Sequence, residues 1–144
     1  MIGIVVAAHG DLAAALVSTA KSVFPESGAI EAVGITADDD AASYEIRLKA
    51  AVEQSDPNGG VILLTDMFGG TPSNVGLTLH QPGRVEVLTG ANLPMLIKAM
   101  QLSTQEIPLA TAARQVKEYG RRAIAVASEV LGMNPTTAQP EKTP

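Results

Sequence analysis

The stretch IGIVVAAHG, residues 2–10, decides the fold of this chain. Residues 2–8 form a continuous apolar run with several β-branched side chains, a pattern that is typical of a strand buried on both faces. Gly10 breaks the run, Asp11 can cap a helix, and the spacing of apolar residues predicts that helix over residues 12–23. A buried strand followed at once by a helix favours a parallel sheet, because parallel neighbours need a crossover connection.

The same alternation of strand and helix continues along the chain. A further apolar run predicts a strand over residues 61–65, and residues 29–35 and 84–88 also read as strands. Helical spacing and turn residues predict helices over residues 41–54, 73–79, 93–102 and 108–131. We therefore expect an α/β fold with an open, mainly parallel four-stranded sheet and helices on both faces.

The composition excludes several classes of protein. A net charge of -5 without a block of Lys and Arg argues against nucleic-acid binding. No apolar run approaches the roughly 20 residues that span a bilayer, so we expect no membrane insertion. The first strand lacks the basic flank of a signal peptide, and the absence of cysteine excludes disulfides, a thiolate nucleophile and cysteine-based metal sites. We expect a cytoplasmic protein without a metal or cofactor.

The length of 144 residues suits a single domain. We assign residues 1–131 to that domain. Residues 132–144 are rich in Thr, Gln and Pro, which offer nothing to bury, so we expect a disordered tail there.

Polar residues at the ends of the first and third strands form the candidate site. In an open parallel sheet, ligands bind beyond the carboxyl ends of the strands, where His9 and Asp66 are expected. His9 precedes a helix whose positive N-terminus favours a negatively charged group. If the two strands are neighbours, Asp66 can reach one imidazole nitrogen and leave the other free as a nucleophile. Gly69, Gly70 and Thr71 would then donate N–H and hydroxyl groups to phosphoryl oxygens.

Each of these residues, taken alone, also fits a structural role. A lone histidine after a strand is more often exposed or structural, and an aspartate there is usually a turn residue or a cap. Only their coincidence at one sheet edge favours a phosphoryl site. We expect His80 to face solvent at a helix end, and Asp38–Asp40 to form a capping turn rather than a metal site.

Three motifs give the chain a family resemblance: IGIVVAAHG at residues 2–10, LLTDMFGGTPSN at 63–74 and LTGANLPML at 88–96. Together they resemble the enzyme IIA domains of the mannose type in the bacterial phosphoenolpyruvate-dependent sugar phosphotransferase system, over residues 1–131. The resemblance implies that His9 takes a phosphoryl group from the histidine phosphocarrier protein and passes it to a IIB component. It also implies that Asp66 orients His9. In the glycine-rich loop over residues 67–73, the glycine loop, it implies that Thr71 is the hydroxyl residue that contacts the phosphoryl group.

The resemblance carries expectations about assembly as well. Family members form homodimers, and some exchange a C-terminal strand, which would add a fifth, antiparallel strand to the sheet. The best-known mannose transporters continue through a linker into a IIB domain, whereas this chain stops at Pro144. We therefore expect IIB on a separate chain, and a role in sugar uptake or in its regulation.

Other interpretations remain open at this point. The phosphotransfer subunit of a dihydroxyacetone kinase shares the fold and the histidine, but its glycine loop usually differs. A receiver domain phosphorylated on Asp66 would need an acidic pair after the first strand and a lysine after a fifth strand. Here His9, Gly10 and Asp11 follow the first strand, and no lysine is placed in that way. A chelatase would need further metal ligands beside His9. A phosphorylation-dependent regulatory module would bind different targets in its phosphorylated and unphosphorylated forms. A non-phosphorylated binding module, finally, would not use His9 as an acceptor.

Overall fold

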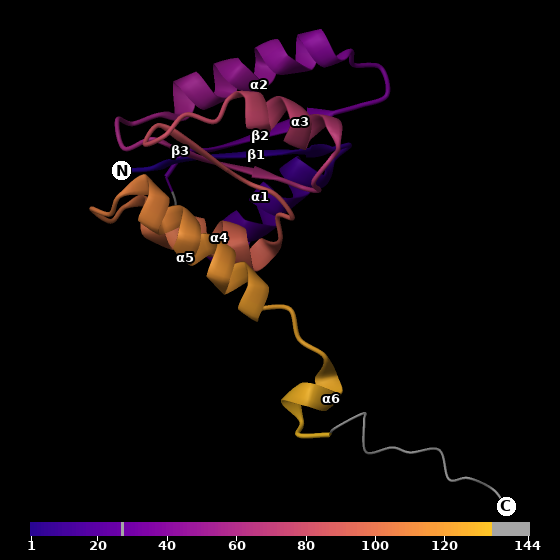
Figure 1. Cartoon of the computed structure of the whole chain (residues 1–144), viewed down its shortest axis with the longest axis vertical. Helices are drawn as coiled ribbons and strands as arrows, with labels where there is room; N and C mark the ends of the chain where they lie inside the picture. The colour runs from indigo at the N-terminus through magenta and orange to yellow at the C-terminus, as the bar shows by residue number, and fades with distance from the viewer. Residues whose placement is uncertain (27, 134–144) are drawn as a thin grey trace, which may run out of the picture.

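A four-stranded, all-parallel sheet lies at the centre of the computed structural model, which describes residues 1–26 and 28–133 (Figure 1). Its strands are β1 (Gly3–His9), β2 (Ile30–Ile35), β3 (Val61–Thr65) and β4 (Val85–Leu88), and they lie in the order β2-β1-β3-β4. The helices are α1 (Leu12–Val23), α2 (Ala41–Ser55), α3 (Thr71–Thr78), α4 (Leu93–Ser103), α5 (Leu109–Arg122) and α6 (Ala127–Val130). The α/β fold with an open parallel sheet is confirmed, and the exchanged fifth strand stays a prediction.

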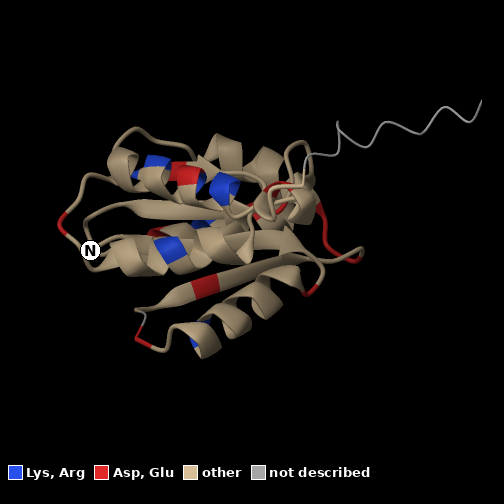
Figure 2. Ribbon diagram, turned by 90° about the horizontal axis from the view of Figure 1, so that it is seen from below, with Lys and Arg blue, Asp and Glu red and all other residues tan. Residues whose placement is uncertain are grey.

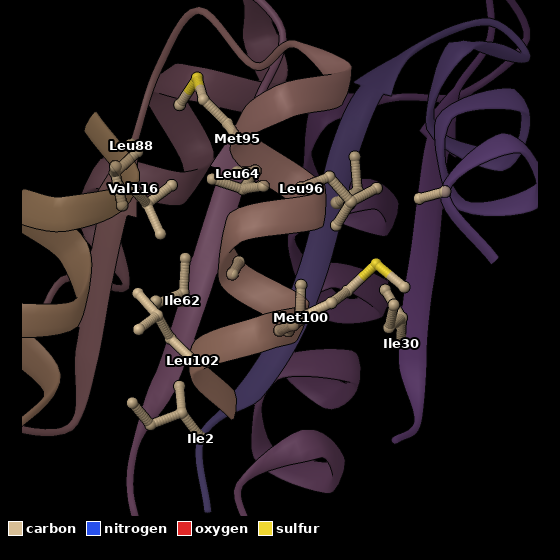
Figure 3. Close-up of a cluster of buried hydrophobic side chains, with 14 of the residues drawn as sticks. Ile2, Ile30, Ile62, Leu64, Leu88, Met95, Leu96, Met100, Leu102 and Val116 are labelled. Carbon is tan, nitrogen blue, oxygen red and sulfur yellow. The ribbon is translucent and has the colours of Figure 1, made fainter. Parts of the chain in front are cut away.

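The sheet separates two hydrophobic layers, which explains why its central strands β1 and β3 read as continuous apolar runs. Helices α1, α4 and α5 cover one face, and α2 and α3 cover the other (Figure 1). Successive residues of a strand point to opposite faces, so Ile62 and Leu64 face the first layer while Val61 and Leu63 face the second. Met95, Leu96 and Met100 of α4 fill much of the first layer (Figure 3).

The strand order reverses between β1 and β3. The chain leaves β1 through α1 for β2 on one side, and it leaves β3 through α3 for β4 on the other side. Such a reversal is where open α/β sheets bind ligands, at the carboxyl ends of the strands. Ala7 pairs with Thr65, so His9 and Asp66 emerge together at this edge.

The C-terminal helix differs from its prediction over residues 108–131. Helix α5 ends at Arg122, and α6 follows separately at Ala127–Val130. Gly120, which packs against Met95, is the last buried residue of α5, and nearly every described residue after it is exposed. A short helix without packing is marginal, so α5 stops where its contact with the body stops.

Two further expectations concern the ends and the surface of the chain. The tail expected over residues 132–144 lies, from residue 134 onward, outside the described residues. Within the described ranges, none of the helices has the length and apolarity needed to cross a membrane.

Candidate functional site

His9 and Asp66 contact each other at the carboxyl ends of β1 and β3. His9 ends β1, and its Nδ1 lies 2.7 Å from Oδ2 of Asp66. The same carboxylate oxygen accepts the backbone N–H of His9 at 2.9 Å, and Oδ1 accepts the N–H of Met67 at 2.9 Å. One carboxylate therefore holds both the main chain and the ring of His9.

The protonation of Asp66 follows from its surroundings. Its side chain is 9% exposed, and burial acts to raise its pKa. The hydrogen bonds from the backbone and ring of His9 and from Met67 outweigh that effect and hold the pKa of Asp66 below its ordinary value. An ionised carboxylate only accepts hydrogen bonds, so the proton of a neutral His9 ring lies on Nδ1 and the lone pair on Nε2.

Gly70 packs against the opposite edge of the His9 ring. A Cβ atom at Gly70 would lie 2.7 Å from Cε1 and 3.3 Å from Nε2 of His9. The backbone before α3 comes this close to Nε2 because position 70 carries no side chain. Gly69, with a φ of 88°, makes the turn that brings it there, and Thr71 is the first residue of α3.

Two helices begin beside His9 without a side-chain cap. Helix α2 is capped by Asp40, whose Oδ1 accepts the N–H of Ser43 at 2.7 Å, whereas α1 and α3 have no such bond. In the described part of the chain, the backbone N–H groups of Gly69, Gly70 and Thr71 donate to no protein acceptor. The positive start of α3 therefore stays available for an anion next to Nε2.

The expectation that Asp11 caps α1 is wrong. Asp11 has φ -92° and ψ 4°, whereas a capping residue has an extended backbone that brings its side chain over the first turn. Gly10, with a φ of 57°, makes the turn between β1 and Asp11.

The remaining polar candidates lie apart from the His9–Asp66 pair. Asp40 caps α2 as predicted. His80 lies just after α3 with its Nε2 3.5 Å from Oε1 of Glu86. Among the described residues, no group of three or more His, Cys, Asp or Glu side chains could hold a metal ion.

Exposed apolar side chains in the segments that follow His9 and Asp66 were not predicted from the sequence. Leu12, Met67 and Phe68 are exposed, and Phe68 is 76% exposed. Several acidic residues lie in loops, whereas most basic residues lie on helices (Figure 2). The signal was present, since Met67 and Phe68 are large apolar residues in a loop where nothing requires them for a core.

Comparisons with known proteins agree with this geometry. Residues 3–117 match the family described as the PTS system fructose IIA component, EIIA-man. The chain is 26% identical over 132 residues to the fructose-specific EIIA component of Bacillus subtilis, covering 91% of this chain and 90% of that protein. It is 25% identical to the mannose-specific EIIAB component of Escherichia coli, across 99% of this chain and 46% of that protein.

Solved structures show the same fold. The EIIA component from Streptococcus agalactiae superposes with a TM-score of 0.80 at 24% identity, over 90% of this chain and 99% of that one. The IIA protein associated with a fucose utilization operon in Streptococcus pneumoniae gives 0.77 at 27% identity, over 90% and 96% of the two chains.

Proposed function

The chain belongs to the mannose/fructose-type enzyme IIA family of the sugar phosphotransferase system, and from that premise we propose that His9 relays a phosphoryl group between proteins. The donor is the histidine phosphocarrier protein and the acceptor is a IIB component. The observation that supports this proposal best is the contact between His9 Nδ1 and Asp66, because it leaves Nε2 as the nucleophile beside two uncapped helices.

The transfer step involves no loss of a proton from His9. The lone pair of Nε2 attacks the phosphorus atom of the donor phosphohistidine, and the phosphorus–nitrogen bond to the donor breaks as its electron pair returns to the donor ring. Positive charge develops on the His9 ring as the new bond forms. Asp66 stabilises that charge through the hydrogen bond from Nδ1. The same steps in the opposite sense deliver the group to IIB.

The glycine loop stabilises the phosphoryl oxygens during transfer. Their charge in the transition state favours donors that are already in place. The N–H groups of Gly69, Gly70 and Thr71 lie at the start of α3, and Gly70 touches the Nε2 edge of His9. The Thr71 hydroxyl supplies a further donor. These are the roles that we propose for the three residues.

Donor and acceptor bind to the same surface in turn. Each must bring its phosphorylated or accepting residue to the same Nε2 atom, so the two partners cannot bind together. The exposed apolar side chains Leu12, Met67 and Phe68 belong to the segments that directly follow His9 and Asp66, and we propose them as the docking surface.

Phosphorylation on Asp66, as in a receiver domain, fits the site poorly. Both oxygens of Asp66 accept hydrogen bonds, and its side chain is nearly buried. His9, in contrast, is 48% exposed at its side chain. A partner can therefore reach His9 without breaking the contacts of Asp66.

Incubation with phosphoenolpyruvate, enzyme I and the phosphocarrier protein tests the proposal. We expect the wild type and His80→Ala to be phosphorylated and His9→Ala to remain unmodified, because His80 lies apart from the pair. The bound group should be lost in acid and survive alkali, as for a phosphohistidine. Equal labelling of His9→Ala, or a group that alkali removes, would show that His9 is not the acceptor.

We also propose that the protein is a homodimer. Residues 123–133, the C-terminal arm, extend away from the body with Ile124, Val126, Val130 and Leu131 exposed (Figure 1). Strand β4 is an edge of the sheet, and a hollow of about 540 Å³ lies between it and α5. An apolar arm and an open strand edge are complementary surfaces, so the arm of a second copy fits beside β4.

A further inference from the structure

Two buried hydroxyl groups lie behind the candidate site without a hydrogen-bond partner. Thr65 ends β3 and Ser73 is in the first turn of α3, and both residues are fully buried. Within the described part of the chain, neither Oγ1 of Thr65 nor Oγ of Ser73 finds a partner. Burying an unpaired hydroxyl costs stability, so a pair of them next to a functional loop requires a physical reason.

The two hydroxyls belong to the same layer of the fold. Thr65 follows Leu63 on the α3 face of the sheet, and a Cβ at Gly76 would lie 3.3 Å from Cγ2 of Thr65. Ser73 precedes Gly76 by three residues and therefore lies on the same side of α3, one turn nearer to the glycine loop. Both hydroxyls are thus enclosed between β3 and α3, directly behind the loop 66–70.

Thr65 connects three parts of the site. Its carbonyl oxygen accepts the N–H of Ala91 at 2.9 Å and so holds the loop after β4. The next residue is Asp66, which holds His9. A link from the Thr65 side chain to Ser73 would add the start of α3, whose N-cap Gly70 touches the His9 ring.

We propose that Thr65 and Ser73 bind one internal water molecule and act as positioning residues for the loop 66–70. Each hydroxyl can donate and accept, and a buried water binds where two or more polar groups converge. The two hydroxyls do not bond each other, so a bridging molecule satisfies both at once. The bridge holds α3 at a fixed distance from β3 and thereby sets the place of Gly70 against His9. The effect on transfer, though not the water site, rests on the proposed function of His9.

The test uses Thr65→Val, Thr65→Ser, Ser73→Ala and the double variant Thr65→Val/Ser73→Ala. Thr65→Val keeps the methyl group that faces Gly76 and loses the hydroxyl, whereas Thr65→Ser keeps the hydroxyl and loses the methyl group. Ser73→Ala removes the other hydroxyl without touching β3. Urea unfolding and the NMR signal of the His9 Nδ1 proton are recorded on the unphosphorylated protein, and transfer rates are measured separately.

We expect Thr65→Val and Ser73→Ala each to lower the urea midpoint, and the double variant to lower it no further than one of them, because both lose the same water. The His9 Nδ1 proton should shift and exchange faster, and transfer should fall about tenfold, as for other groups that orient a reactive residue. Thr65→Ser should keep the wild-type proton signal. A raised urea midpoint in Thr65→Val, or single effects that simply add, would overturn the shared water. A wild-type protein that is never phosphorylated would instead contradict the relay, with the urea and NMR results unaffected.

Discussion

At His9, a single carboxylate oxygen determines both the orientation of the ring and the position of its proton. Oδ2 of Asp66 accepts the backbone N–H and the Nδ1–H of the same residue. The ring therefore cannot rotate without losing one of these bonds, and Nε2 stays on the side of Gly70. Orientation of this kind is a large part of what an enzyme supplies to a transfer between two rings.

Replacing Asp66 by Asn should slow phosphoryl transfer while the fold is retained. The amide keeps the size of the side chain but lacks the charge that stabilises the phosphorylated ring. Loss of one such electrostatic contact costs on the order of 3 kcal/mol in the barrier, or roughly 100-fold in rate. Asp39→Asn is the matched control, because Asp39 also has a lowered pKa but bonds Thr36 and Arg47 instead. Rapid-quench kinetics with the phosphorylated donor measures both, and equal rates for the two variants would contradict the role of Asp66.

The same variant should change how stability depends on pH. The pKa of Asp66 is lower in the folded protein than its ordinary value of 3.8, so its ionised form stabilises the fold. That contribution is present above the unfolded pKa and disappears as the pH falls through the folded pKa. Urea unfolding at pH 6 and at pH 3 should therefore show a larger loss for the wild type than for Asp66→Asn. Asp39 and Asp40 also have lowered pKa values, but they are present in both proteins and cancel in the comparison.

Gly70→Ala should displace the His9 ring. The new Cβ would lie 2.7 Å from Cε1, closer than carbon atoms approach, so the ring or the loop must move. A displacement of about 1 Å at a reacting atom can cost on the order of 100-fold in rate. Gly28→Ala is the control, since no atom of the described residues lies within 4 Å of a Cβ there. Transfer at the wild-type rate in Gly70→Ala would show that the loop does not set the place of Nε2.

At the level of helices and strands, the sequence predicted the elements whose burial is uniform. Strand β3 matches its predicted range, because a short run of consecutive apolar residues is typical of a strand that is buried on both faces of a parallel sheet. The end of α5 was missed because the apolar residues after Arg122, such as Ile124 and Val126, read as a continuing helix although they are exposed. The periodicity of apolar residues indicates which residues could be buried, but which of them are buried depends on the elements that pack against them.

Helix α2 offers a test that separates stability from function. Asp40→Ala removes the N-terminal cap of α2, in which Asp40 accepts the N–H of Ser43, and should lower the free energy of unfolding by about 1 kcal/mol. Transfer should not change, because α2 begins with its own cap and takes no part in holding the phosphoryl group. Asp38→Ala, in the same loop, is the control for the change of charge. Urea unfolding and the transfer assay together decide this, and slowed transfer in Asp40→Ala alone would assign the start of α2 to the site.

At the scale of the whole molecule, the order of the strands in the sheet, which brings the site residues together, could not be predicted from the sequence. His9 and Asp66 are 57 residues apart, and their contact exists only because β3 lies beside β1. The motifs around both residues indicated a shared role, but the pairing of Ala7 with Thr65 depends on how the helices pack on the sheet. The two uncapped helices and the close approach of Gly70 are likewise properties of backbone geometry, which residue types alone do not reveal.

The C-terminal arm provides the last prediction, which concerns assembly. If the arm of one copy packs beside β4 of another, replacing apolar side chains of the arm by charged ones should dissociate the dimer, because burying a charge without a partner is costly. We expect Ile124→Asp/Val126→Asp to be monomeric at concentrations where the wild type is dimeric. Ile46→Asp is the matched control: Ile46 is 71% exposed on α2, comparable to the 76% of Ile124, but lies outside the arm. Sedimentation equilibrium measures the mass of each, and a dimeric arm variant or a monomeric wild type would contradict the exchange.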